Sequence, residues 1–170
     1  MQTKCFHSIC SNTNKNTDLY TIKNQLDPSI WAENINKSDF ASTFQTFGWH
    51  RFIKESTDTN SEVFVLSSNN HLKALIVVML MREKGIKKYF SKRGIVFGGP
   101  LLSSDITEKE LQYFLEQISR SLNKKVIYLE TRNFFDYSSF RNAFENAVWN
   151  YDPWLNFQLI IEPEDHIKKN

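Results

Sequence analysis

Glycine is scarce in this chain: only 5 of its 170 residues are glycine, beside 4 prolines and 2 cysteines. Such a composition excludes a collagen-like repeat and a glycine-rich linker protein. A content of 41% hydrophobic and 24% charged residues also excludes a disordered chain. Three of the five glycines, Gly94, Gly98 and Gly99, stand close together. Because glycine is used where the backbone needs unusual freedom, this segment is the first candidate for a functional loop.

Long apolar runs and a large charge of one sign are missing as well. The longest apolar run, 74–81, is far shorter than the roughly 20 residues of a transmembrane helix and suits a buried strand. The first ten residues contain Lys4 but no apolar core of the kind found in secretory signals. A net charge of +2, with scattered basic residues, does not match a protein that coats nucleic acid. We therefore expect a cytoplasmic protein with no transmembrane segment.

The two cysteines lie near the N-terminus, in a polar segment without periodicity. Cys5 and Cys10 flank His7 and together offer three zinc ligands, whereas a structural zinc site takes four. We therefore expect no metal site, and free thiols in a reducing compartment. Residues 1–17 are interpreted as a flexible leader.

The rest of the chain begins with helix and hairpin signals. Asp27 followed by Pro28 is typical of a helix start, and a second short helix is expected after Gly48. The apolar segments 62–66 and 72–81 flank a turn of serine and asparagine residues. This arrangement predicts an antiparallel hairpin.

The second half of the chain alternates helix and strand patterns. Thr107 and Glu110 form a capping box at the start of the clearest helix. Segment 125–132 is apolar on both faces, which predicts a strand in the middle of a sheet. A helix is expected over 138–148 and a closing strand over 154–161. The order of elements predicts an α+β fold: one domain, residues 18–165, with a mixed, mostly antiparallel sheet flanked by helices.

The glycine segment permits several interpretations. It could form an anion cradle, a structural turn or bulge, or one wall of a substrate cleft. It contains neither of the nucleotide-binding glycine patterns. The gap between Arg93 and Gly98 is too long for the coenzyme A turn of N-acetyltransferases, and Pro100 removes one backbone donor.

Few other residues suggest chemistry. Glu130 and Arg132 share one strand face, where they could bind a ligand or form an ion pair at the sheet margin. Gln45 and Lys54 could border a pocket among aromatic residues that otherwise read as core. The four histidines are dispersed, and no serine stands in a nucleophile elbow, so nothing indicates a hydrolase. No catalytic residue is assigned.

Several segments, in this order, carry a family resemblance. They are YFSKRGIVFGGPLL (89–102), YLETRN (128–133) and FDYSSFRNAFENAVW (135–149). With these segments the chain resembles the N-terminal half of the FemABX family, the aminoacyltransferases that build peptidoglycan cross-bridges. The resemblance implies two tandem domains with the GNAT N-acyltransferase fold. This chain would then be the first domain, and residues 166–170 would lead to the second.

The resemblance also implies a function, the formation of amide bonds on an amine acceptor, with a cell-wall precursor as the expected acceptor. The donor, aminoacyl-tRNA or acyl-CoA, would be bound with the second domain, so we expect no cofactor here and no activity from this chain alone. Contact with tRNA would also run through that domain. The residues expected to bind the acceptor are Lys54, Arg93, Gly94, Gly98, Gly99, Asp105 and Arg132. Two alternatives stay open: a stand-alone N-acetyltransferase that uses acetyl-CoA, and a non-catalytic binding module.

Overall fold

The described strands form one eight-stranded sheet. The computed structural model describes residues 2–5, 20–57, 59–69, 71–82 and 92–152, and all structural statements below concern these residues. The strands are β1 (Gln2–Cys5), β2 (Tyr20–Lys23), β3 (Thr59–Ser68), β4 (His71–Met81), β5 (Arg93–Gly98), β6 (Leu101–Leu102), β7 (Tyr128–Asn133) and β8 (Asn150–Tyr151). Their order is β2-β3-β4-β5-β7-β1-β8, with β6 also paired to β4.

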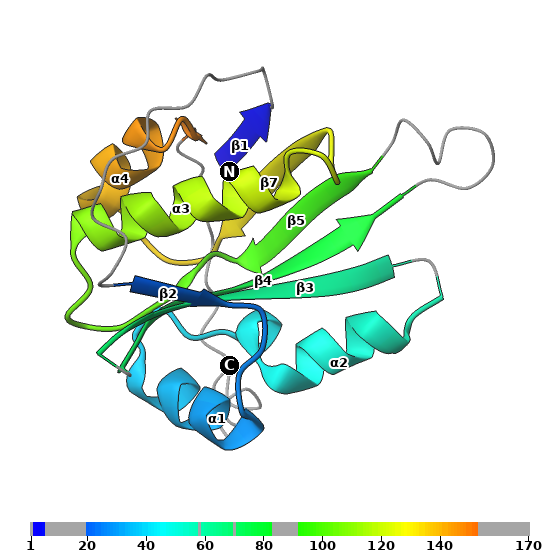
Figure 1. Cartoon of the computed structure of the whole chain (residues 1–170), viewed down its shortest axis with the longest axis horizontal. Coiled ribbons are helices and arrows are strands. Elements are labelled where there is room, and N and C mark those ends of the chain that lie inside the picture. The colour runs from blue at the N-terminus through cyan, green and yellow to red at the C-terminus, as the bar shows by residue number, and fades with distance from the viewer. Residues whose placement is uncertain (1, 6–19, 58, 70, 83–91, 153–170) are drawn as a thin grey trace, which may run out of the picture.

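Helices cover both faces of this sheet. They are α1 (Pro28–Lys37), α2 (Phe47–Glu55), α3 (Glu108–Leu122) and α4 (Arg141–Asn146), with short 3-10 turns at Thr43–Gln45 and Ser138–Phe140. Figure 1 shows α1 and α2 on one face and α3 and α4 on the other. Among the described pairs, β5 and β7 run parallel and the rest are antiparallel. The predicted fold class, a mixed, mostly antiparallel sheet flanked by helices, is confirmed.

Local sequence signals account for several of these elements. The Asp27 carboxylate accepts a hydrogen bond from the Ser29 N–H at 2.8 Å, and Pro28 is the first residue of α1. The predicted hairpin is β3–β4, in which Val63 lies opposite Val77. The predicted central strand is β7, which pairs with β5 on one side and β1 on the other.

Two expectations need correction. The predicted helix 138–148 is a 3-10 turn followed by the short α4, and the chain turns at Val148, where φ is 62°. Gln2–Cys5, placed by the sequence in a flexible leader, forms β1 between β7 and β8. Strand pairing there runs through backbone groups, which side-chain composition does not reveal. Residues 6–19 and the expected strand 154–161 lie outside the described residues.

Alternation along the strands creates two apolar layers. Val63 and Val65 of β3 pack with Trp31 on the α1 and α2 side, whereas Phe64 and Leu66 pack on the α3 and α4 side. This two-sided burial explains why β3 and β4 read as nearly continuous apolar runs.

The short β2 leaves part of the sheet edge uncovered. β2 pairs with β3 only from Val65 to Ser68, and after Lys23 the chain leaves the sheet towards α1. The outer edge of β3 from Thr59 to Phe64 is therefore not covered by β2. This edge lies beside α2, which packs on β3.

Candidate functional site

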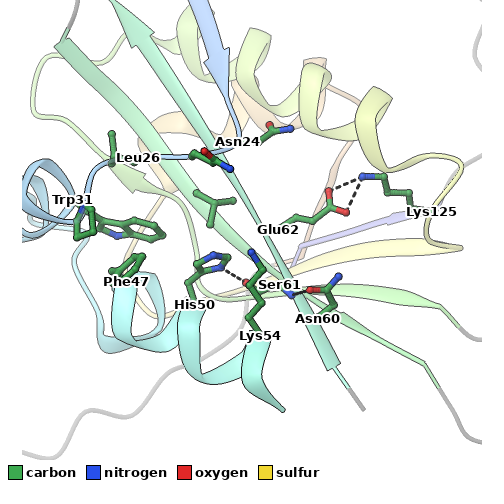
Figure 2. A pocket seen from close by; sticks show the side chains of 13 residues that line it. Asn24, Leu26, Trp31, Phe47, His50, Lys54, Asn60, Ser61, Glu62 and Lys125 are labelled. Carbon is green, nitrogen blue, oxygen red and sulfur yellow. Dashed lines mark hydrogen bonds and ion pairs between the residues drawn. The ribbon is translucent and has the colours of Figure 1, made fainter. Parts of the chain in front are cut away.

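A pocket of about 600 Å³ lies where β2 ends, between α2 and the uncovered part of β3 (Figure 2). The segment between β2 and α1 forms one side, with Asn24, Gln25 and Leu26, and Pro28 and Trp31 of α1 adjoin it. The other side carries Phe47, His50 and Lys54 of α2, residues 60–63 of β3, and Lys125. The lining thus combines aromatic walls with amide and charged groups, as ligand sites commonly do.

The helical period of α2 presents its side chains to this pocket. Phe47, His50 and Lys54 are three and four residues apart, which places them on one helix face. Thr46 fixes the start of the helix, because its Oγ1 accepts a hydrogen bond from the Trp49 N–H at 3.2 Å.

His50 is held in a defined orientation. Its Nδ1 lies 2.8 Å from Ser61 Oγ, and its ring stacks on that of Trp31, with 5.8 Å between centroids. Partial burial lowers the pKa of His50 below its ordinary value of 6.5, and the ammonium of Lys54 lowers it further. The neutral form of the imidazole therefore predominates at pH 7. Ser61 is only 4% exposed, so its hydroxyl orients the ring and is not an accessible nucleophile.

The charges around the pocket are partly compensated. Lys125 Nζ lies 2.8 Å from both carboxylate oxygens of Glu62. Lys54 forms no ion pair with any residue in the described part of the chain. The pocket consequently keeps one positive charge on its α2 side.

A buried amide joins the pocket wall to the glycine segment. Gln45 is fully buried, and its Nε2 donates to the Gly99 carbonyl at 2.6 Å. Its backbone carbonyl accepts a hydrogen bond from Trp31 Nε1, also at 2.6 Å. The position of the Trp31 ring in the pocket is therefore coupled to the turn after β5.

The turn after β5 depends on two glycines and on a hydrogen bond from a buried tyrosine. Gly98 and Gly99 both have φ of 82°, the left-handed region that favours glycine. The Tyr137 hydroxyl donates to the Pro100 carbonyl at 2.7 Å, and a Cβ on Gly99 would lie at the same distance from that hydroxyl oxygen. Burial raises the pKa of Tyr137. These features give Gly98 and Gly99 a structural role in a turn, one of the interpretations that the sequence left open, and their expected role in acceptor binding stays a prediction.

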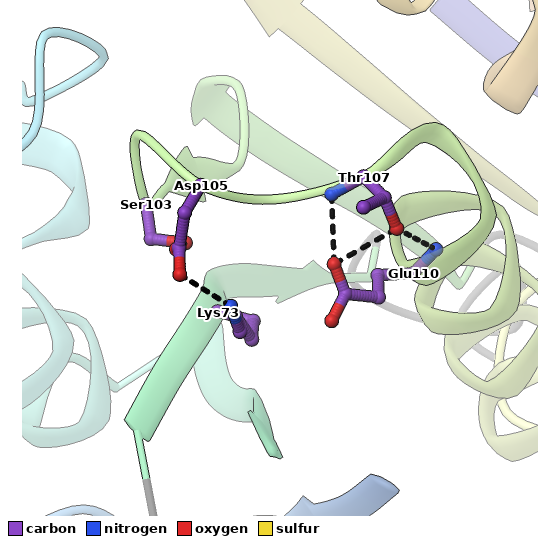
Figure 3. A network of polar contacts seen from close by, with 5 residues as sticks. All are labelled: Lys73, Ser103, Asp105, Thr107 and Glu110. Atoms are coloured by element: carbon purple, nitrogen blue, oxygen red, sulfur yellow. Dashed lines mark hydrogen bonds and ion pairs between the residues drawn. The ribbon is translucent and has the colours of Figure 1, made fainter. Parts of the chain in front are cut away.

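The next helix start along the chain, at α3, is also unfavourable for an anion (Figure 3). Glu110 accepts a hydrogen bond from the Thr107 N–H at 2.7 Å, and Thr107 Oγ1 accepts from the Glu110 N–H at 3.3 Å. Glu108 adds a second carboxylate to the first turn of α3. Negative side chains thus already take the place that a phosphate would favour at a helix N-terminus.

The structure places the seven expected site residues in several locations. Lys54 lines the pocket, while Gly98, Gly99 and Arg132 lie near the carboxyl ends of the parallel strands β5 and β7. Arg93 is at the opposite end of β5, and its guanidinium lies 3.4 Å from the Tyr128 hydroxyl. Gly94 is packed inside the sheet, where a Cβ would lie 2.7 Å from Leu129 Cδ1. These residues do not form one cluster.

Asp105 and Arg132 are engaged in ion pairs. Lys73 donates to Asp105 at 2.6 Å, and this hydrogen bond, together with one from Ser103, lowers the pKa of Asp105 (Figure 3). Arg132 lies 2.8 Å from the buried carboxylate of Glu130, with its guanidinium 5.3 Å from the centre of the Phe97 ring. Both side chains therefore have structural partners already.

Sequence reasoning missed His50 and Ser61. They lie eleven residues apart on a helix and a strand, so no local motif joins them. The spacing of Phe47, His50 and Lys54 was the available signal, since it puts a histidine and a lysine on one face of the expected helix.

The described residues contain neither a metal-binding cluster nor a membrane-spanning helix. Within the described ranges, no three histidine, cysteine, aspartate or glutamate side chains gather in a way that could hold a metal ion. None of the described helices has the length and apolar character needed to cross a membrane.

Comparison with known proteins establishes the fold. No family model and no curated protein sequence matches the chain. Among solved structures, glucosamine-6-phosphate N-acetyltransferase from Arabidopsis thaliana is 14% identical, with a TM-score of 0.53 over 85% of this chain and 100% of that chain. Aminoglycoside antibiotic 6'-N-acetyltransferase from Acinetobacter haemolyticus is 12% identical, with a TM-score of 0.51 over 84% and 99%.

A third similar structure is ribosomal-protein-alanine N-acetyltransferase from Brucella melitensis biovar Abortus 2308. It is 10% identical, with a TM-score of 0.50 over 84% of this chain and 99% of that chain. At such identities the likeness concerns the fold alone. The chain has the fold of the GNAT N-acetyltransferases.

Proposed function

We propose that this domain holds the amine acceptor in an amide-forming acyl or aminoacyl transfer, as the first domain of a FemABX-type transferase. The acceptor binds in the pocket between α2 and β3, and the proposed acceptor class is a peptidoglycan precursor. The observation that carries the proposal is this pocket, with a neutral imidazole and a lysine, on a GNAT fold. Its volume lies within the roughly 300–1,000 Å³ usual for small-molecule sites.

The acyl donor belongs elsewhere in this proposal. Because the chain has the GNAT fold, coenzyme A is the first donor to consider. Its pyrophosphate group needs backbone N–H donors and no negative side chains nearby. The capping box of Thr107 and Glu110, with Glu108 beside it, does not fit that group. Pro100 also offers no N–H in the turn after β5. A second domain in cis that presents the donor, and through it contact with tRNA and a cytoplasmic location, belong to the same proposal.

One observation favours a second candidate, a stand-alone N-acetyltransferase that uses acetyl-CoA. The chain covers 99–100% of three solved N-acetyltransferase structures, so its length alone suits such an enzyme. The charge at the start of α3 argues against this candidate.

Calorimetric titrations with a uridine-diphosphate-linked muropeptide and with acetyl-CoA separate the candidates. We expect the muropeptide to bind and acetyl-CoA to give no heat. Binding of acetyl-CoA at micromolar concentration without muropeptide binding would favour the stand-alone enzyme. No binding of either probe would favour a scaffolding module.

A matched pair of variants on α2 locates the site. Phe47 lines the pocket, whereas Phe52 lies on the same helix outside it and is 63% exposed. Phe47→Ala removes an aromatic wall and is expected to weaken muropeptide binding about tenfold, or 1.4 kcal/mol. Phe52→Ala is expected to leave the dissociation constant unchanged. Equal effects of the two substitutions would place the acceptor elsewhere.

A further inference from the structure

The side chain of His50 has two nitrogens in different surroundings. Nδ1 is taken by the hydrogen bond to the buried Ser61 hydroxyl, at 2.8 Å. Nε2 has no hydrogen bond within the described residues, and His50 itself lines the pocket. Figure 2 shows the imidazole between Phe47 and Ser61, with Lys54 on the next turn of the same helix. The ring is thus fixed at one nitrogen and available at the other.

We propose that His50 Nε2 accepts the proton that the acceptor's ammonium group releases when it becomes a nucleophilic amine. This inference rests on the proposed function, because it assumes that the acceptor amine enters the pocket. It requires the tautomer in which Nδ1–H donates to Ser61 Oγ, which leaves the lone pair on Nε2. His50 is then the catalytic base and Ser61 is a positioning residue.

The charges facing the ring act on both partners of the proposed proton transfer. Lys54 comes from α2 itself, and β3 contributes Glu62, which is already paired with Lys125 from the segment before β7. The lining residues from α1 and from the segment between β2 and α1 carry no charge. A lysine ammonium next to the site disfavours a second positive charge, whether on His50 or on the bound amine. Lys54 therefore lowers the pKa of His50 and would also ease deprotonation of the acceptor.

The atoms balance without a redox partner. The ammonium gives one proton to Nε2 and becomes an amine. The electron pair of the amine nitrogen forms an N–C bond to the carbonyl carbon of an acyl ester, which is the donor class of the proposed reaction. The ester C–O bond breaks, and the leaving alkoxide takes a second proton from the same nitrogen. The products are a secondary amide, an alcohol and an imidazolium.

Nuclear magnetic resonance of the histidine rings tests the inference without any donor. The His50 signals are assigned by their loss in His50→Gln, and His71, exposed on β4, is an internal reference. In the free chain, ring nitrogen shifts are expected to show the tautomer with hydrogen on Nδ1. Ser61→Ala is expected to reduce its population. A dominant Nε2–H tautomer in the unsubstituted chain would overturn the proposal.

The decisive comparison uses the muropeptide and the same muropeptide with its amine acetylated. If the ammonium lies against Nε2, binding of the unmodified muropeptide is expected to lower the pKa of His50 by about one pH unit or more. The acetylated compound, which binds the same pocket without that charge, leaves the pKa of His50 unchanged. Equal effects from both bound compounds, or none from either, would overturn the role of His50 while acceptor binding stands. Failure of both to bind would overturn the proposed function and this inference with it.

Lys54→Met supplies a check on the charge argument. Removing the ammonium is expected to raise the pKa of His50 towards 6.5 in the free chain. Lys109→Met, on the exposed side of α3, is the control. An unchanged pKa of His50 in Lys54→Met would contradict the role given to Lys54.

Discussion

Single residues decide the shape of the turn after β5. Gly99 has a φ of 82°, and a Cβ there would lie 2.7 Å from the Tyr137 hydroxyl oxygen. Gly99→Ala is expected to destabilise the fold by about 1–3 kcal/mol from the left-handed backbone alone. Urea unfolding would show this as a lower midpoint with an unchanged slope.

Gly48 provides the matched control. A Cβ on this α2 residue would meet only Thr46 Oγ1, at an ordinary 3.8 Å. Gly48→Ala is expected to stabilise the fold by less than about 1 kcal/mol, because it restricts the unfolded chain. If Gly99→Ala and Gly48→Ala gave the same midpoint, the turn would not depend on glycine.

His50 makes stability depend on pH in a definite direction. Its pKa in the folded chain lies below the value of 6.5 expected for an unfolded chain. Between the two values the unfolded chain binds more protons, so stability falls as the pH falls through 6.5 towards the folded pKa. His50→Gln is expected to flatten this part of the curve of unfolding free energy against pH. The same slope in the unsubstituted chain and in His50→Gln would contradict the assignment.

At the scale of elements, α3 depends on its first turn. Thr107 Oγ1 accepts the Glu110 N–H, so Thr107→Ala is expected to cost about 1 kcal/mol. For a chain of this size such a loss lowers the melting temperature by about 2–4 °C. Thr107→Ser keeps the hydroxyl and is expected to melt within a degree of the unsubstituted chain. Equal melting of Thr107→Ala and Thr107→Ser would show that the cap is unimportant.

Elements with local signals were predictable from the sequence. Two helix starts are marked by hydrogen bonds between residues close in sequence. They are the start of α1, with Asp27 and Pro28, and the start of α3, with Thr107 and Glu110. The apolar runs of the β3–β4 hairpin show where the sheet is buried on both faces. β1 carries no such pattern, because its place between β7 and β8 rests on backbone pairing between distant segments.

The candidate site was predictable only in part. Lys54 was expected to contact a ligand and does line a pocket. The hydrogen bond between His50 and Ser61 depends on how α2 packs against β3. The two residues are eleven positions apart on a helix and a strand, and this spacing does not predict such packing. The composition of the glycine segment made it a candidate for a functional loop. Its positive φ values and the hydrogen bond from the Tyr137 hydroxyl to the Pro100 carbonyl show that it also stabilises the fold.

At the scale of the whole molecule, the proposed function assigns acceptor binding and donor binding to different sites. The GNAT fold is shared with proteins named as N-acetyltransferases, whereas the start of α3 carries carboxylates where a donor's phosphates would need positive charge. In the proposed function, the amine-bearing acceptor binds in the pocket on the α1 and α2 face. Acceptor binding in this domain is therefore proposed to be separate from donor binding.

Amide chemical-shift mapping with the uridine-diphosphate-linked muropeptide tests this separation most directly. The account predicts shifts that concentrate in α2, in residues 60–63 and in the segment between β2 and α1, with acetyl-CoA leaving the spectrum unchanged. Shifts induced by acetyl-CoA around Gly98, Gly99 and the first turn of α3, with no response of the pocket to the muropeptide, would contradict it.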